Sequence, residues 1–172
     1  MTPSFSRPLH QPGADIPAGT DEMLFVLHLL SHGASWRTFD FLGFHHRMRE
    51  SWKRPGRWYL QKWPSPRAMA SIRGKIRDRT DRRYARVSLD LVVADLNPVL
   101  RGWGGYFRYG NSAAKFSHID GYVNERLAIL ASAKHGLQGR NWVTRFNYQW
   151  VNQLGVHRLS GTTRPTTAYA SR

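Results

Sequence analysis

Apolar residues recur at spacings of three and four along three successive segments of the chain, and this pattern predicts helices that each bury one face. In the first segment the recurring residues are Met69, Ile72 and Ile76. Ser65 and Pro66 predict where this helix begins, because a serine side chain caps a helix and proline suits the first helical position.

Two further helices are predicted by the same spacing. Ser88 should cap the second helix, and we expect Pro98 to kink or restart it. Its apolar positions are Leu89, Val92, Val93, Leu96, Leu100, Trp103 and Phe107. Ser117 and Asp120 have the spacing of a capping box and predict the start of a third helix, which should end near Gly136. Its inner face comprises Ile119, Val123, Leu127 and Leu130.

Two aromatic, β-prone runs at residues 38–48 and 57–63 flank the turn pair Pro55-Gly56, which predicts a β-hairpin. Residues 139–159 hold enough apolar side chains for a docked fourth helix. The predicted fold is mainly α: a three- to four-helix bundle preceded by a β-hairpin, with disordered termini. We expect a disordered or unrelated leader at 1–35, the hairpin at 36–64, the helical domain at 65–160 and a disordered tail at 161–172.

The chain is strongly basic, with 26 Lys and Arg against 11 Asp and Glu and a net charge of +15. At least 20 of these bases are arginine, whose planar guanidinium can bind phosphate through two hydrogen bonds. Residues 37–86 contribute +11, from 15 basic and four acidic residues. Aromatic residues make up 13% of the chain, which argues against a disordered basic tail. These features predict a folded domain that binds a polyanion.

The main candidate contacts with the polyanion lie along the first helix. They are Arg73, Lys75, Arg77, Arg79, Arg82, Arg83 and Arg86. Arginines three or four positions apart on a helix can follow a phosphate backbone, and only Asp78 and Asp81 interrupt this series. The alternative is a solvated charged face.

A second candidate group lies in the next helix and combines cations with an aromatic ring suited to stacking on unpaired bases. Its members are Arg101, Tyr106 and Arg108. Trp103 could stack as well, although its spacing of four from Phe107 equally indicates a core position. Gly102, Gly104 and Gly105 would each weaken the helix by about 1 kcal/mol relative to alanine. We therefore expect another backbone or a bound ligand to approach them.

A third group of cations surrounds the predicted hairpin turn. Its members are Arg47, Arg49, Lys53, Arg54 and Arg57. These side chains could reach the groove of a duplex, or they could simply keep a sheet edge from aggregating.

No residue set predicts catalysis, a cofactor or a metal site. His45 and His46 are neighbours on a predicted strand and point to opposite faces, so both cannot easily bind one ion. The aspartates of the helices, and Glu125 with Arg126, are interpreted as surface charges rather than as a nuclease site. The chain has no cysteine, which excludes disulfides, thiolate zinc sites and cysteine nucleophiles.

The apolar run from Met23 to Leu30 is much shorter than the roughly 20 residues that a membrane-spanning helix needs. Asp21 and Glu22 precede it, where a secretory signal would carry positive charge. We therefore expect a cytoplasmic protein.

Two landmarks resemble a known family. The stretch from Leu96 to Arg108, LNPVLRGWGGYFR, is similar to the signature of the maturase domain, called domain X, of group II intron-encoded reverse transcriptases, and residues 116–127 continue it. Residues 39–44, FDFLGF, with the hairpin and the first helix after them, resemble the last palm motif and the first thumb helix of the same proteins. The resemblance covers residues 37–160.

This resemblance implies a thumb that grips a primer-template duplex and a domain X that holds folded intron RNA in a shape competent for splicing. The splicing chemistry of the family belongs to the RNA, so neither role requires a catalytic residue. Family members carry a Tyr-Ala-Asp-Asp metal-binding turn, which this sequence lacks, and we expect no polymerase activity. In the family the hairpin packs on a palm, so two alternatives are open: the module acts alone, or it acts beside a separately encoded polymerase portion.

Three functions are left open by the sequence. The first is an RNA-binding maturase-type module that binds and stabilises structured group II intron RNA for splicing and is not catalytic by itself. The second is a truncated reverse-transcriptase remnant without a function. The third is a generic basic nucleic-acid-binding protein, which would bind unrelated RNAs equally well.

Overall fold

The computed structural model describes residues 38–56, 58–136 and 145–164. All of them fall within the unit that begins at Arg37. The expected leader at 1–35 lies outside the described residues. Within the described ranges the structure is mainly helical and begins with an antiparallel sheet, which confirms the predicted fold class. None of the helices in these ranges has the length and apolar character needed to cross a membrane.

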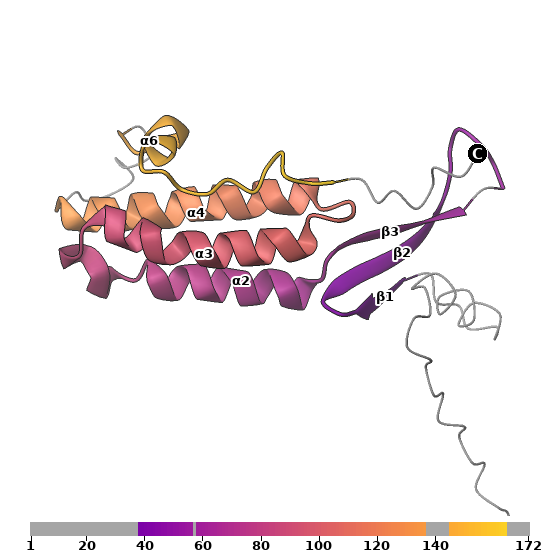
Figure 1. Ribbon diagram of the computed structural model, residues 1–172, viewed down its shortest axis with the longest axis horizontal. Helices are drawn as coiled ribbons and strands as arrows, with labels where there is room; N and C mark the ends of the chain where they lie inside the picture. The colour runs from indigo at the N-terminus through magenta and orange to yellow at the C-terminus, as the bar shows by residue number, and fades with distance from the viewer. Residues whose placement is uncertain (1–37, 57, 137–144, 165–172) are drawn as a thin grey trace, which may run out of the picture. The chain divides into compact units, whose positions relative to one another are not determined.

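The sheet has three antiparallel strands in the order β1 (Thr38–Phe41), β2 (Phe44–Glu50) and β3 (Trp58–Pro64), as Figure 1 shows. The predicted hairpin corresponds to β2 and β3. The first predicted run, however, is two strands joined by a tight turn at Leu42 and Gly43, which have φ angles of 47° and 79°. Positive φ at both central residues is typical of a tight hairpin turn. Leucine seldom adopts this conformation, so the turn could not be predicted from the residue type.

The first helix, α2, spans Pro66–Arg79 and begins where predicted, but it ends before Arg82, Arg83 and Arg86, which we expected on the same helix. The Ser65 hydroxyl accepts a hydrogen bond from the Ala68 N–H at 3.2 Å, which satisfies one of the free donors of the first turn. Its three predicted core residues, Met69, Ile72 and Ile76, are buried. A short 3-10 helix, η1 (Arg82–Arg86), follows it.

The second helix, α3, spans Leu89–Phe107 and does not restart at Pro98, which lies inside it. Ser88 precedes the helix, but its side chain makes no capping hydrogen bond. The third helix, α4, spans Ala113–Lys134 and thus begins before Ser117. The predicted capping box of Ser117 and Asp120 is therefore wrong. The predicted inner-face residues Ile119, Val123, Leu127 and Leu130 are buried, and Gly136 follows the end of the helix with a φ of +64°.

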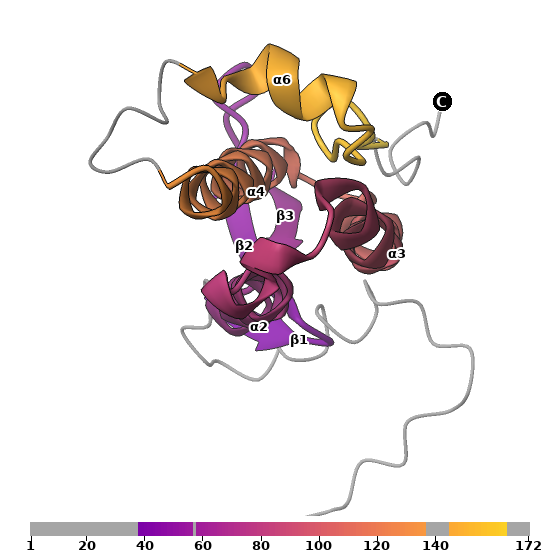
Figure 2. The same ribbon diagram turned by 90° about the vertical axis from the view of Figure 1, so that its left-hand side faces the viewer.

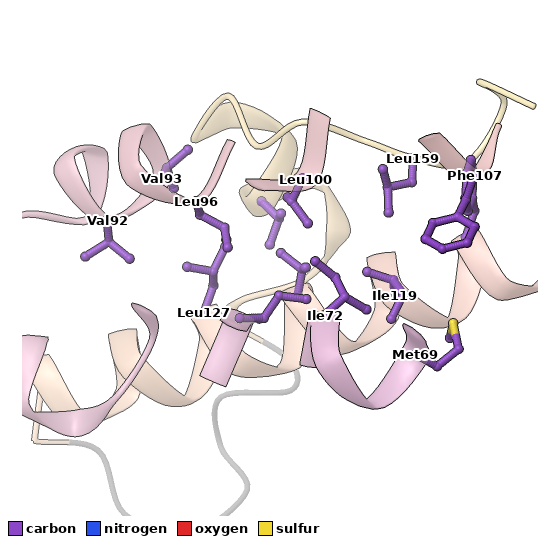
Figure 3. Packing of buried hydrophobic residues seen from close by; sticks show 14 of the residues in the cluster. Met69, Ile72, Val92, Val93, Leu96, Leu100, Phe107, Ile119, Leu127 and Leu159 are labelled. Atoms are coloured by element: carbon purple, nitrogen blue, oxygen red, sulfur yellow. The ribbon is translucent and has the colours of Figure 1, made fainter. Parts of the chain in front are cut away.

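A last short helix, α6 (Tyr148–Gln153), lies above α4 in Figure 2. It leads into an extended segment, residues 155–164, which we call the C-terminal strap. Leu159 of the strap is fully buried and joins the core between α3 and α4, and Figure 3 shows its side chain near Leu100 and Phe107.

Residues 161–164, which we expected to be disordered, contain one turn within the strap and one hydrogen bond to the end of α3. The Thr162 N–H donates to the Leu159 carbonyl at 3.1 Å, and the Arg164 N–H donates to the Arg108 carbonyl at 2.8 Å. The remainder of the expected tail lies outside the described residues.

Candidate nucleic-acid interface

The cations of α2 lie on two sides of that helix. Arg73 and Arg77 are four positions apart and share the side next to α4, where the Arg73 guanidinium lies 5.9 Å from the centre of the Tyr122 ring. Lys75 and Arg79 share the opposite side, next to α3. The predicted single row is therefore two short cationic rows that flank the buried face.

Arg79 is already engaged within the protein. Its Nε atom lies 3.1 Å from Oδ2 of Asp95 on α3, and its Nη1 atom donates to the Lys75 carbonyl at 3.2 Å. In contrast, Arg73, Lys75 and Arg77 are exposed, and no carboxylate in the described part of the chain forms an ion pair with them. These three are free to meet phosphate, whereas Arg79 would have to leave Asp95.

The η1 helix continues the positive surface. The Asp81 carboxylate caps it by accepting the Arg83 N–H at 3.0 Å. The Arg83 side chain lies 3.8 Å from the same carboxylate and 5.2 Å from the centre of the Tyr84 ring. Arg82 and Arg86 are exposed without such contacts among the described residues. Arg82 and Arg86 are thus the cations of η1 best placed for an outside anion.

The junction between α2 and η1 is held from α4 by Arg126, which was interpreted as an ordinary surface residue. The half-buried Arg126 side chain donates from Nη2 to the Thr80 carbonyl at 3.1 Å and from Nε to the Thr80 hydroxyl at 3.2 Å. Thr80 itself is buried. This contact fixes the relative position of the two cationic elements, so their arginines stand at a defined spacing.

The aromatic candidates of α3 are held largely by protein contacts. The Tyr106 hydroxyl donates to the Leu42 carbonyl at 2.8 Å and thereby ties α3 to the β1–β2 turn, although 51% of the residue remains exposed. Trp103 is half-buried and packs against Phe107 and Phe116, with ring centres 4.9 and 5.5 Å away. The core interpretation of Trp103 therefore accounts for most of its contacts.

The two arginines of the α3 candidate group, Arg101 and Arg108, differ in how far contacts within the protein hold their side chains. Arg101 is exposed. Arg108 is half-buried, donates from Nη2 to the Tyr109 hydroxyl at 2.9 Å, and lies 4.9 Å from the centre of the Tyr109 ring. Arg101 can reach an outside ligand, whereas Arg108 is partly committed to Tyr109.

The hairpin cations Arg47, Arg49, Lys53 and Arg54 are exposed at and beside the β2–β3 loop, and Arg57 lies outside the described residues. The loop is closed by the Glu50 carboxylate, which accepts the Gly56 N–H at 2.6 Å. Lys53 lies 5.7 Å from the centre of the exposed Trp52 ring. The loop thus offers cations beside an aromatic ring, away from the cations of α2.

The family-like signature in α3 has a structural role that the sequence analysis missed. The Asn97 side chain donates to the Gly155 carbonyl at 3.0 Å and accepts the His157 N–H at 2.7 Å. The Asn97 carboxamide thus forms two hydrogen bonds with the backbone of the strap, one as donor and one as acceptor. On α4, the two carboxylate oxygens of Asp120 accept the N–H groups of Leu159 and Ser160 at 3.0 and 2.8 Å.

The glycines of the signature are of two kinds. A β-carbon at Gly104 would lie 2.5 Å from the Leu159 side chain, so the bare backbone makes room for the strap. At Gly102 and Gly105 a β-carbon would meet nothing within 4 Å among the described residues. The close approach at Gly104 is made by a side chain and not by the backbone or ligand that we expected, and Gly102 and Gly105 leave an open helix surface.

The pKa of His157 in the strap is lowered from its ordinary value of 6.5. Partial burial is the main cause, the positive charge of Arg101 acts in the same direction, and the carboxylate of Asp120 opposes both. The folded protein therefore favours the neutral form of the His157 imidazole.

The two histidines of β2 are separated as expected. His46 is buried and stacks on Phe39 at 4.8 Å between ring centres, whereas His45 is partly exposed and its Nδ1 atom contacts the Asp40 carboxylate. In the part of the chain that the structure describes, no three His, Asp or Glu side chains are grouped as a metal site would require.

Comparison with known proteins gives one family. The comparison with curated proteins produced no significant match. A family model described as the group II intron maturase-specific domain matches residues 69–148, which run from the first turn of α2 through η1, α3 and α4 to the start of α6. Residues 69–148, which carry the cationic surface of α2 and η1 and the Asn97 and Asp120 anchors of the strap, thus match the group II intron maturase-specific domain.

Proposed function

We propose that this protein binds structured group II intron RNA and stabilises it for splicing, while the RNA performs the chemistry. The family match supports a role in group II intron splicing. The contact with RNA is supported by one observation above the others: the exposed cations on either side of the α2–η1 junction, Arg73, Lys75, Arg77, Arg82 and Arg86.

The spacing and rigidity of these cations suit a folded RNA. Arg77 precedes the buried Thr80 and Arg82 follows it, and Arg126 clamps that residue from α4. A cationic surface of fixed shape favours an RNA whose phosphates already lie at matching positions. A flexible basic tail would bind any strand equally well.

The test is a salt titration of binding to a group II intron transcript and to a scrambled RNA of equal length. If six to eight phosphates are neutralised, the logarithm of the affinity should fall against the logarithm of salt with a slope on the order of −4 to −7. The intron transcript should bind more tightly than the scrambled RNA at moderate salt. Equal affinities would instead support a generic nucleic-acid-binding protein.

A charge-matched pair of variants makes the test specific. Replacing Arg77, Arg82 and Arg86 by alanine should weaken intron binding and make the salt slope shallower by about 2 to 3. Replacing the exposed Arg145, Arg158 and Arg164 by alanine removes the same net charge from the C-terminal segment. If both triple variants bind alike, net charge rather than the α2–η1 surface attracts the RNA.

A separate polymerase portion is the protein partner that we propose beside the RNA. Leu42 is 62% exposed at the β1–β2 turn, and Tyr106 and Tyr109 are 51% and 41% exposed. Exposed apolar residues of this size suit a protein contact. Co-purification of the chain with a palm fragment, and its loss in a Leu42→Lys variant, would support this partner.

A further inference from the structure

A surface hollow of about 330 Å³ lies where the end of the sheet meets the first turns of α2 and α4. Figure 1 shows that both helices begin at the end of the bundle from which the sheet extends. Residues from four elements contribute to it, among them His45, Trp63, Met69, Arg73, Lys115 and His118. Of these, only Arg73 was predicted from the sequence as a contact residue.

The hollow combines an apolar base with a cationic rim. Met69 and Pro64 are buried, and Trp63 is half-buried beside them, with its ring centre 5.1 Å from that of His45. Arg73 and His118 are exposed and Lys115 is partly exposed. None of the residues that line the hollow is acidic.

This composition fits a nucleotide better than a purely apolar or purely ionic ligand. A base is a flat aromatic surface that stacks on tryptophan, and its phosphate needs arginine or lysine. Ligand sites typically measure roughly 300 to 1,000 Å³, so 330 Å³ is at the small end of that range and suits one nucleotide rather than a run of several.

The position of the hollow connects it to the surface already assigned to RNA. Arg73 lines the hollow and lies one helical turn before Arg77 on the same side of α2. A strand that follows Arg77 and Arg73 toward the start of α2 therefore arrives at Trp63 and Lys115. Only a nucleotide released from base pairing could enter, because a paired base has its ring faces covered by its neighbours.

We propose that the hollow receives one unpaired nucleotide of the bound RNA, with its base against Trp63 and its phosphate between Arg73 and Lys115. The proposal rests on the RNA-binding function proposed above. It adds a preference for an RNA helix interrupted by a bulged or looped-out nucleotide.

The experiment compares two RNA hairpins of the same sequence, one fully paired and one with a single bulged nucleotide, both at fixed salt. The wild-type protein should bind the bulged hairpin roughly 10-fold more tightly. Trp63→Ala should remove this difference and leave the affinity for the paired hairpin unchanged, whereas Trp63→Phe should keep most of it. Trp58→Ala is the matched control, because Trp58 is exposed on the same strand and does not line the hollow.

A second measurement does not depend on variants. With 4-thiouridine as the bulged nucleotide, ultraviolet cross-linking followed by trypsin digestion should label the peptide of residues 63–67. Labelling confined to other peptides would overturn the proposal even if Trp63→Ala failed to fold.

The outcomes separate this proposal from the function on which it rests. Equal wild-type affinity for the paired and bulged hairpins would refute the nucleotide site and leave RNA binding intact. Absence of binding to either hairpin and to the intron transcript would refute both. If adenosine or uridine monophosphate binds as tightly as the bulged hairpin, the hollow is a site for a free nucleotide, and the proposal is wrong.

Discussion

Leu159 of the strap lies against the bare backbone of Gly104 on α3, where a β-carbon would come within 2.5 Å of its Cδ2 atom. Leu159 is fully buried and its neighbours are core side chains, so it has little room to move aside. The glycine that weakens the helix locally thus allows the strap to close over the bundle.

Gly104→Ala should therefore lower the stability of the protein. Overpacking costs roughly 1 to 3 kcal/mol, and the better helix propensity of alanine recovers about 1 kcal/mol. We expect a net loss of about 1 kcal/mol, which corresponds to a fall in melting temperature of about 2 to 4 °C. Gly105→Ala, one residue along in open space, should instead raise the melting temperature, and a rise in both variants would contradict the close contact with Leu159.

Removal of the Asp120 carboxylate should release the strap. Asp120→Ala leaves the N–H groups of Leu159 and Ser160 without their acceptors, and we expect the free energy of unfolding to fall by about 2 to 3 kcal/mol. Glu125→Ala, an exposed carboxylate on the same helix, should change it by less than about 0.5 kcal/mol. Urea denaturation measures both. Equal effects would show that the hydrogen bonds of Asp120 contribute little.

Arg77 and Arg79 should differ in their effect on RNA binding although both belong to the predicted cationic series. Arg77→Ala should make the salt slope of RNA binding shallower by about 0.7 to 0.9, the effect of one lost phosphate contact. Arg79→Ala should change it less, because Asp95 already neutralises Arg79.

The Asp95→Asn variant provides the converse measurement. It frees the Arg79 guanidinium from its ion pair, and we expect RNA affinity to rise and the slope to steepen in a filter-binding titration. Stability should change by at most about 1 kcal/mol, because the pair is at the surface. A fall in affinity would show that the pair positions Arg79 for RNA rather than competing with it.

The strap should loosen as the pH falls. Because the pKa of His157 in the folded protein lies below 6.5, the unfolded chain takes up a proton first, and protonation favours unfolding. The contribution of His157 is complete above about pH 6.5 and is lost as the pH falls through the lowered folded-state pKa. His157→Gln should make the melting temperature less sensitive to pH between 7 and 5 than that of the wild-type protein. Identical pH profiles for the variant and the wild-type protein would count against this role of His157.

The helices were predictable because their signals are local. Ser65, Pro66 and the spacing of Met69, Ile72 and Ile76 lie within 12 residues, and the structure has the helix they indicate. The start of α4 was misplaced because Ser117 and Asp120 imitate a capping box, whereas the Asp120 carboxylate binds a segment 39 and 40 residues further along. No residue near Asp120 in the sequence indicates that its carboxylate binds Leu159 and Ser160.

The candidate site was predicted in its composition but not in its arrangement. The arginines of α2 and η1 could be counted from the sequence, but whether each was free depended on distant partners such as Asp95 for Arg79. The hollow beside Trp63 could not be foreseen, because its walls come from β2, β3, α2 and α4. Lys115 and His118, one turn apart in the same helix, gave a weak sign only.

The strap also sets the order in which the fold can be completed during synthesis. Asn97 and Asp120 find their partners 39 to 60 residues later in the chain, so the three long helices leave the ribosome before the segment that joins them. At a translation rate of roughly 5 to 20 residues per second, several seconds pass before Leu159 is available to pack against Gly104. A message cut short before the codon for Leu159 would yield a chain that carries the cationic helices but never closes over them.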